Sequence, residues 1–414
     1  MRIAFITNEY VTEETFSGGL ANYLGRITTA LADRGHEVHV FTRSMAGNEV
    51  IDHRGVTVHR VVPLWDRKMR LDRIDGLCPR SLYAPYQDLK AAWSLWVRWK
   101  RAQQKTPFDL IQAANVLGVG LFFRGLKHVP RVMRLSSYRP VWDTAAGVEQ
   151  NRATKTRWWM ERVVIESFPH LYAPTSYVAR LTEENYRVPK VNVIETPFYL
   201  EEPEEDYSVF QEVCAGKEYL LFFGRMTQMK GTHLLAQALP QLLFRYPEAH
   251  AIFVGGNGPS PDGDPMPDFI RRQTAEFSDR VHLLGSLRHQ QLYPLIRNAR
   301  IVALPSLMDN LPNTCLEAMA LGRTVVATTG TCFEQLIESG QSGVLVEPGN
   351  VTALAEGLIK AWELEPEQRE QIGQAAQERI EELHPDRKVP ELIAYYQRII
   401  ESHLQRQKSP VPVL

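Results

Sequence analysis

Two carboxylates stand eight positions apart in a segment that follows one apolar run of the chain. The run 301–305 is typical of a buried strand, and the segment after it carries Asp309 and Glu317. In an open α/β sheet, ligands bind beyond the carboxyl end of a strand, where the next helix begins. An ionised carboxylate accepts several hydrogen bonds, which suits the hydroxyls of a sugar. The segment therefore predicts a site for a nucleotide sugar.

Two cations follow another predicted strand. Arg225 and Lys230 lie between the apolar run 219–223 and a predicted helix over 233–245. A guanidinium can hold a phosphate through two parallel hydrogen bonds, and an ammonium adds a compact positive charge. Because the sequence has no metal-binding motif, a departing diphosphate would need such cations for neutralisation. The alternative is that both side chains are solvated surface cations.

Weaker signals lie at the ends of other predicted strands. Gly18 and Gly19 follow the first strand and precede a helix over 20–34, where glycine lets backbone N–H groups approach an anion. Such a pair is also an ordinary turn. Glu334 follows the run 324–327, and its alternative role is to cap a helix N-terminus. The glycine-rich run 254–259 is either a ligand loop or a tight turn.

Length and composition favour a two-domain soluble enzyme. The chain has 414 residues, more than one ordinary core accommodates, with 44% hydrophobic and 23% charged residues. The first residues predict a strand, not a signal peptide, and no run of apolar residues is long enough to cross a membrane. Four scattered cysteines are typical of reduced thiols, so we expect a cytoplasmic protein. Neither a metal nor a cofactor is expected.

Strands and amphipathic helices alternate along the chain, which predicts parallel sheets with helices on both faces. We expect an N-terminal domain over 1–197, an acidic linker over 198–216, a second domain over 217–384 and a terminal helical segment over 385–414. The expected strands are 2–7, 37–41, 56–60, 109–112, 131–135, 171–173 and 191–194 in the first half, and 219–223, 251–254, 281–284, 301–304, 324–327 and 344–346 in the second.

Charge is divided unequally between the two halves. Residues 1–197 hold 28 Lys and Arg against 19 Asp and Glu, whereas the remainder holds 19 against 29. The asymmetry suggests different partners for the two domains, although drift in surface composition explains it equally well. Within the basic half, residues 63–105 combine cations with tryptophans. That stretch predicts peripheral contact with an anionic membrane, or an acceptor site; the alternative is that the tryptophans are core. Its residues include Arg67, Lys68, Arg70, Arg73, Arg80, Trp93, Trp96 and Trp99.

Together these motifs resemble the retaining glycosyltransferases of family four. The resemblance runs through Ser17-Gly-Gly-Leu20, Gly224-Arg225 with Lys230-Gly231, Val254-Gly-Gly-Asn-Gly-Pro259, Val281-His-Leu-Leu-Gly285, Leu316-Glu-Ala-Met-Ala-Leu-Gly322 and Gly340-Gln-Ser-Gly-Val-Leu-Val346. It covers nearly the whole chain. The resemblance implies a GT-B fold of two Rossmann-like domains with a cleft between them and a C-terminal helix crossing back to the first. It also implies metal-independent transfer from a UDP- or GDP-sugar to a saccharide, lipid-linked or small-molecule acceptor.

The resemblance also implies roles for individual residues. Arg225 and Lys230 match the diphosphate-binding pair, and Gly18-Gly19 matches a backbone contact to phosphate. Asp309 and Glu317 match the two acids of the E-x7-E motif, with Glu317 holding the ribose and Asp309 near the donor sugar. Further donor contacts are expected from Leu287, Asn310, Leu311 and Glu334.

Two departures from the family pattern concern the sugar. The first acid of the motif is usually Glu and here is Asp309, so its reach is one methylene shorter. The family commonly places a His after the strand 131–135, where this chain has Ser136 and Ser137, which become possible sugar or acceptor contacts. Both departures bear on which sugar is transferred more than on the reaction type.

Two rival functions come from other classes. A nucleotide-sugar epimerase of the same architecture would need acid–base pairs at the sugar, and only Asp309 and Glu334 offer themselves. An inactive nucleotide-sugar-binding protein would not need Arg225, Lys230 and Glu317 together. A hydride-transfer enzyme is disfavoured because no GxGxxG follows the first strand.

Overall fold

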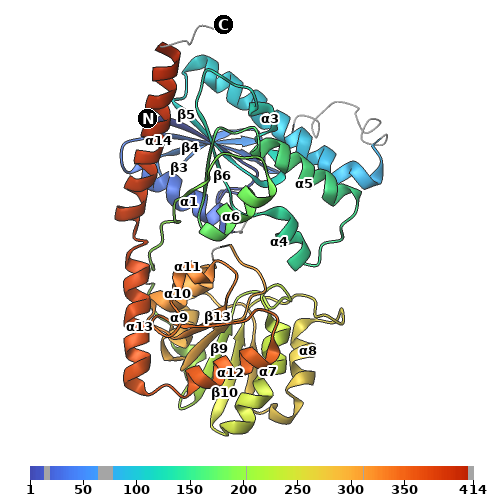
Figure 1. Cartoon of the computed structure of the whole chain (residues 1–414), viewed down its shortest axis with the longest axis vertical. Coiled ribbons are helices and arrows are strands. Elements are labelled where there is room, and N and C mark those ends of the chain that lie inside the picture. Colours follow the sequence, from blue (N-terminus) through green and yellow to red (C-terminus); the bar gives the residue numbers. More distant parts are fainter. Residues whose placement is uncertain (14–18, 64–77, 202, 311, 409–414) are drawn as a thin grey trace. The chain divides into compact units, whose positions relative to one another are not determined.

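Two compact units make up the chain. The computed structural model describes residues 1–13, 19–63, 78–201, 203–310 and 312–408. Unit 1 comprises Met1–Pro140, Glu149–Pro197 and Pro385–Leu414, and unit 2 comprises Val141–Val148 and Phe198–His384. Each unit is a sheet flanked by helices, so the predicted α/β class with two Rossmann-like sheets is confirmed (Figure 1).

The sheet of unit 1 has eight strands over the described residues, in the order β3-β4-β2-β1-β5-β6-β7-β8. Neighbouring strands are parallel except β3 and β4. The central strands β1 and β5 are almost entirely buried because helices cover both of their faces. The strands are β1 (Arg2–Thr7), β2 (Glu37–Arg43), β3 (Val50–His53), β4 (Val56–Val61), β5 (Leu110–Ala114), β6 (Arg131–Arg134), β7 (His170–Ala173) and β8 (Asn192–Val193).

Helices cover the two faces of this sheet separately. Apolar side chains of α1 and α14 pack on one face, and those of α3, α5 and α6 pack on the other. Helix α1 ends at Ala32, close to the predicted end at 34, and Gly35 follows it with a left-handed φ of 81°. The helices are α1 (Gly19–Ala32), α3 (Tyr83–Lys105), α5 (Arg152–Ile165), α6 (Ser176–Asn185) and α14 (Pro385–Lys408), while α4 (Arg139–Ala145) contains residues of both units and η1 (Arg80–Leu82), η2 (Val116–Gly118) and η3 (Leu121–Phe123) are short turns.

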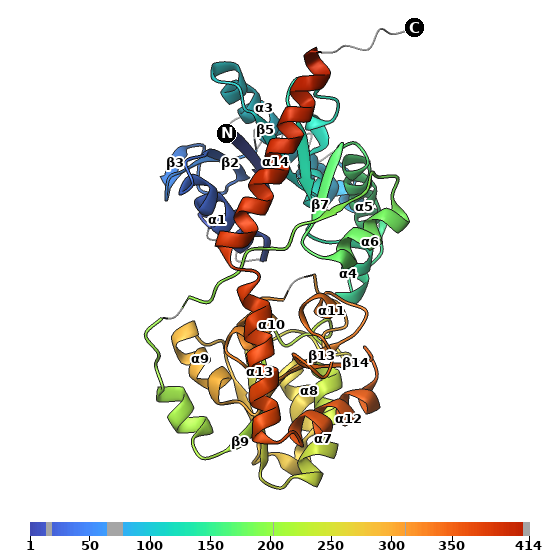
Figure 2. The ribbon, with the colours of Figure 1, turned by 60° about the vertical axis from the view of Figure 1, so that its left-hand side comes forward.

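The terminal helix α14 is anchored to unit 1 by buried tyrosines. The Tyr396 hydroxyl donates to Gln112 Oε1 on β5, and the same oxygen accepts from the Tyr172 hydroxyl at 2.8 Å. Tyr395 donates to the carbonyl of Leu171 at 3.2 Å. Figure 2 shows α14, in red, lying along this unit. The helix runs to Lys408, within the helical segment expected over 385–414.

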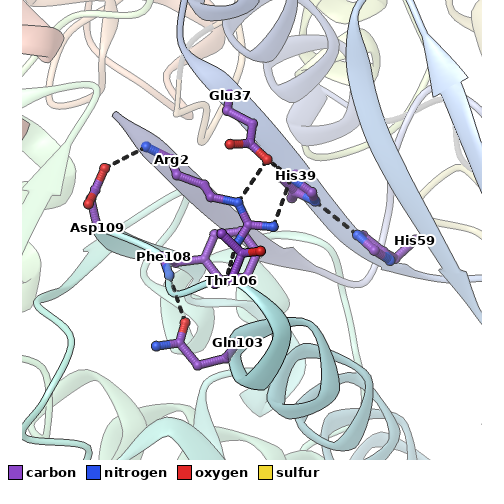
Figure 3. Close-up of polar contacts among 8 residues, drawn as sticks. All are labelled: Arg2, Glu37, His39, His59, Gln103, Thr106, Phe108 and Asp109. Carbon is purple, nitrogen blue, oxygen red and sulfur yellow. Dashed lines mark hydrogen bonds and ion pairs between the residues drawn. The ribbon is translucent and has the colours of Figure 1, made fainter.

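A polar cluster lies near the amino-terminal ends of β1 and β2 (Figure 3). The Arg2 guanidinium donates to Glu37 Oε1 at 2.8 Å and stacks over the Phe108 ring at 4.1 Å. The same carboxylate oxygen lies 2.9 Å from His39 Nε2, and His39 Nδ1 lies 3.0 Å from His59 Nε2. Both imidazoles are 8% exposed, and burial lowers the pKa of His59 to about 3.

Unit 2 has a six-stranded parallel sheet over its described residues, in the order β11-β10-β9-β12-β13-β14. Its two apolar cores lie on opposite faces of the sheet, under helices on both sides. The elements are β9 (Glu218–Phe223), α7 (Thr232–Arg245), β10 (Ala249–Val254), α8 (Met266–Gln273), β11 (Val281–Leu284), α9 (His289–Asn298), β12 (Ile301–Leu304), α10 (Asn313–Ala320), β13 (Val325–Thr328), α11 (Phe333–Leu336), β14 (Val344–Val346), α12 (Val351–Trp362) and α13 (Pro366–Glu381), with the short turns η4 (Phe210–Cys214) and η5 (Ala275–Phe277).

Two segments differ from the sequence-based expectation. Strand β3 is not predicted, because it is short, partly exposed and held to β4 by a two-residue turn, Arg54-Gly55, with φ of 53° and 76°. The expected linker over 198–216 belongs to unit 2. Phe198 and Cys214 are buried in the core of that unit, so this segment is packed against it.

Candidate functional site

The strand order of unit 2 creates a switch point between β9 and β12. From β9 the chain proceeds to β10 and β11 on one side, and it then returns to β12 on the other side of β9. Pairing of Ile301 with Leu220 and of Val302 with Leu221 makes the two strands parallel, so their carboxyl ends meet at one edge. Loops that diverge from such a point leave a crevice in which ligands bind.

Lys230 and Asp309 meet at this point. Lys230 lies in the loop after β9 and Asp309 in the loop after β12, and their side chains form an ion pair. Asp309 is only 5% exposed. The Leu307 amide also donates to the Met229 carbonyl at 2.9 Å, which holds the two loops together. Two predicted site residues that are 79 positions apart in sequence are therefore in direct contact.

Gly231 allows the two loops to approach this closely. Its φ is 67°, in the left-handed region that favours glycine, and it caps the N-terminus of α7. A Cβ at this position would overlap the carbonyl oxygen of Pro305 in the loop after β12. The Lys-Gly dipeptide is thus explained by geometry: glycine brings the backbones together, and the preceding Lys230 reaches across to Asp309.

Arg225 lies on the same loop but remains exposed. Within the described residues its guanidinium has no ion pair, so it differs from Lys230. The loop around it is fixed by backbone hydrogen bonds to the glycine-rich end of β10: the Gly224 amide donates to Val254 at 2.9 Å and the Met226 amide to Gly256 at 2.8 Å. An exposed cation on a fixed loop is suited to receive an anion.

Besides Lys230, Asp309 has the neutral neighbours Asn310, Cys315 and Cys332. The Asn310 amide donates to Asp309 Oδ1 at 3.0 Å, and Asn310 Oδ1 is buried without a hydrogen-bond partner among the described residues. Burial, and then the negative charge of Asp309, raises the pKa of the Cys315 and Cys332 thiols, which stay neutral. Predicted donor contact Leu311 lies outside the described residues.

Glu317 contacts a histidine, whereas Asp309 pairs with a lysine. It lies on α10 with its side chain 13% exposed, and its Oε1 is 3.6 Å from His289 Nε2. His289 is the first residue of α9, and its ring centroid lies 5.2 Å from that of Tyr293. His289 was not predicted as a site residue. Its position shortly after the strand β11 is the signal that could have identified it.

The other predicted donor contacts occupy the same edge of the sheet. Glu334 is exposed on α11, which follows β13. Leu287 follows β11, is half-buried and packs against the core of unit 2. Among the described residues, neither forms a hydrogen bond or an ion pair with Lys230 or Asp309. The carboxyl ends of the parallel strands therefore gather these residues on one edge of the sheet.

Unit 1 has its own switch point, between β1 and β5, and polar groups follow the strands there. Asn115, after β5, accepts from the Ser136 amide and donates to the Ser137 carbonyl, each at 2.8 Å. The buried Arg134 donates to Ser136 Oγ at 2.8 Å. Asn8, after β1, has a buried Oδ1 without a partner among the described residues. Asn8, Asn115 and Arg134 were not predicted.

The remaining sequence-based expectations concern the Gly18-Gly19 pair, a metal site and a membrane span. Gly19 begins α1 and is open to solvent, whereas Gly18 lies outside the described residues. In the part of the chain that the structure describes, no group of three His, Cys, Asp or Glu side chains could hold a metal ion. No helix within those same residues is long and apolar enough to cross a membrane.

Most of the chain matches known glycosyltransferase families. Residues 17–202 match the family described as Glycosyltransferase Family 4, and residues 217–363 match Glycosyl transferases group 1. A D-inositol 3-phosphate glycosyltransferase of Arthrobacter sp. (strain FB24) is 26% identical over 413 residues, covering 95% of this chain and 93% of that protein.

Solved structures share the fold at lower sequence identity. Sucrose-phosphate synthase from Thermosynechococcus elongatus has a TM-score of 0.73 at 19% identity and covers 97% of this chain and 100% of its own. Anabaena HepE, solved in complex with UDP-glucose, has a TM-score of 0.64 at 20% identity, covering 97% and 99%. These similarities show the GT-B fold. The chain belongs to glycosyltransferase family four, a retaining family, and is an enzyme that uses nucleotide-sugar donors.

Proposed function

We propose that the chain transfers a sugar from a UDP-sugar to an acceptor hydroxyl, with retention at the anomeric carbon and without a metal. The observation that carries the proposal is the contact between Lys230 and Asp309 across the β9–β12 switch point, with the exposed Arg225 on the same loop. Two cations and a buried carboxylate at one strand edge match a donor that joins a diphosphate to a hydroxyl-rich sugar. The UDP complexes of HepE make uridine the first base to test.

Each residue is assigned one task. Arg225 and Lys230 bind the diphosphate, whose negative charge grows as it departs. Lys230 has three N–H donors, so it can bind phosphate while it remains paired with Asp309. That pairing fixes the Lys230 side chain before the donor arrives. Glu317 accepts from the ribose hydroxyls, and Asn310 and Asp309 face the donor sugar.

The reaction balances without a protein nucleophile. The bond from the anomeric carbon to the diphosphate oxygen breaks, and a bond from that carbon to the acceptor oxygen forms on the same face. The acceptor proton goes to the departing phosphate oxygen, so the products are a glycoside and UDP. Positioning and charge neutralisation are the two contributions that the protein supplies.

Calorimetry with UDP and GDP tests the donor assignment. Replacing Arg225 or Lys230 removes charge-assisted hydrogen bonds worth roughly 1.5–3 kcal/mol each, so UDP affinity should fall at least about tenfold in Arg225→Ala and Lys230→Met. Lys360→Met, an exposed cation at the end of α12, is the matched control and should bind UDP as the wild type does. Unchanged UDP and GDP binding in the Arg225/Lys230 double variant would show that the diphosphate lies elsewhere.

The acceptor carries the hydroxyl that receives the sugar. It is a saccharide, lipid-linked or small-molecule hydroxyl compound bound by unit 1, where Asn8, Asn115 and Ser136 follow the strand ends. D-inositol 3-phosphate, named for the curated relatives, is the first small molecule to try. Release of UDP from UDP-sugars with and without each acceptor measures the choice, and acceptor-independent release alone would argue against transfer to that compound.

A further inference from the structure

One face of α3 exposes an apolar stripe. Leu89, Trp93 and Trp96 fall at positions i, i+4 and i+7 of this helix, so they share a face. Leu89 is 37% exposed and Trp93 is 39% exposed. Phe122, from the turn η3, extends the stripe, with its ring centroid 5.0 Å from that of Trp93. We call Leu89, Trp93, Trp96 and Phe122 the aromatic patch. Figure 1 shows α3 on the outer side of unit 1.

The predicted core role of the tryptophans holds only in part. Trp99 is 2% exposed and packs in the core against Phe123, with ring centroids 5.2 Å apart. Trp93 points to the other side of the same helix and is exposed. Single exposed apolar side chains are common on proteins, whereas a contiguous apolar patch, such as Trp93 with Phe122, marks a surface that binds a partner or a membrane.

Cations border the aromatic patch. Lys100 continues the stripe at i+11, and its Nζ lies 4.9 Å from the Trp96 ring centroid. Arg124 and Lys127 are exposed in the loop that follows Phe122. We call Lys100, Arg124 and Lys127 the basic rim. An aromatic ring with a cationic border is the composition found at the boundary between lipid headgroups and acyl chains.

Acidic residues are few in the stretch 78–130, which carries the aromatic patch and the basic rim. Residues 78–130 contain eight Lys and Arg but only two acidic residues, Asp88 and Asp109. Asp88 is 3% exposed and paired with Arg157 at 2.6 Å. Asp109 accepts from the Arg2 amide at 2.7 Å, in the polar cluster of Figure 3. The charge of this surface therefore complements an anionic partner.

We propose that the aromatic patch and the basic rim dock unit 1 on a bilayer that contains anionic phospholipid. Trp93 and Phe122 enter the headgroup region, and the basic rim contacts lipid phosphates. The inference goes beyond the proposed transferase activity and does not depend on it. The predicted cations Arg67, Lys68, Arg70 and Arg73 lie outside the described residues.

Co-sedimentation of the full chain tests the docking. One set of vesicles is phosphatidylcholine mixed with phosphatidylglycerol, and the other is pure phosphatidylcholine. Wild type should bind only the mixed vesicles, and the triple variant Lys100→Glu/Arg124→Glu/Lys127→Glu should partition roughly 100-fold less, since each lost cation weakens binding severalfold. The matched control Arg187→Glu/Lys190→Glu/Lys360→Glu makes the same change of charge at exposed sites elsewhere and should bind as wild type.

Trp93→Ala tests the aromatic part. Its partition should fall by about tenfold, and the loss should persist at high salt, where charge contacts are screened. Brominated acyl chains should quench tryptophan fluorescence of wild type more than that of Trp93→Ala. The circular dichroism spectrum and the urea unfolding curve of every variant should match those of wild type, which shows that unit 1 remains folded.

Three outcomes would overturn the proposal. These are equal recovery with both vesicle types, loss of binding in the control triple as large as in the basic-rim triple, and self-association abolished by Trp93→Ala without vesicle binding. The last result would assign the patch to a second copy of the chain.

Discussion

Acid should destabilise unit 1 through His59, and His59→Gln should remove most of that effect. His39 lies between Glu37 and His59, and with His39 Nε2 donating to the carboxylate, its Nδ1 accepts from His59 Nε2. His59 Nδ1 is then unprotonated, buried and without a partner. Protonation would place a positive charge beside His39, Arg98 and Arg2, in a largely buried site.

The sign and size of the effect follow from the pKa of His59. Burial, followed by the charges of His39, Arg98 and Arg2, lowers this pKa from 6.5 to about 3. Between pH 6.5 and about 3, His59 therefore binds a proton in the unfolded chain but not in the folded chain. Stability is fully present above pH 6.5 and is lost progressively as the pH falls from 6.5 toward 3. Between pH 7.5 and pH 5, this one group should cost about 2 kcal/mol of unfolding free energy.

Urea unfolding at several pH values measures the effect. Tryptophan fluorescence reports mainly on unit 1, to which Trp93, Trp96, Trp99 and Trp159 belong, and this matters because a two-unit chain need not unfold in one step. His59→Gln keeps a neutral hydrogen-bonding group beside His39 but cannot titrate. The free energy lost between pH 7.5 and pH 5 should be about 2 kcal/mol smaller in His59→Gln than in wild type. Equal pH dependence of the two proteins would refute the reasoning, because His59 would then not be the group that resists protonation.

Three further predictions concern other parts of the molecule. Gly231→Ala should lower the melting temperature of unit 2 far more than Gly216→Ala, because both have positive φ but only the first would place a Cβ against Pro305; equal shifts in calorimetry would contradict this. Tyr396→Phe should destabilise unit 1 by about 1 kcal/mol and speed amide exchange in α14, because it loses a buried hydrogen bond; unchanged exchange would count against that anchor. Glu317→Gln should weaken UDP binding about tenfold, by loss of a charge-assisted hydrogen bond to ribose; calorimetry showing wild-type affinity would remove Glu317 from the donor site.

The pattern of buried strands was predictable from the sequence because it depends on local composition. Strands covered on both faces, such as β1 and β12, appear as continuous apolar runs bounded by polar residues. Lys230 and Asp309 could be selected because each follows such a run. The short edge strand β3 was not predicted, because its residues are partly exposed and its pairing depends on a turn.

Tertiary structure decided which of these residues touch. The pairing of β9 with β12 sets Lys230 against Asp309, although sequence spacing alone does not say which strands become neighbours. The approach of α9 to α10 likewise brings His289 to Glu317. The same holds for α3, where helical spacing is equally compatible with core and surface. Only the packing of the helix on unit 1 buries Trp99 and leaves Trp93 exposed, because burial is a property of neighbours that are distant in sequence.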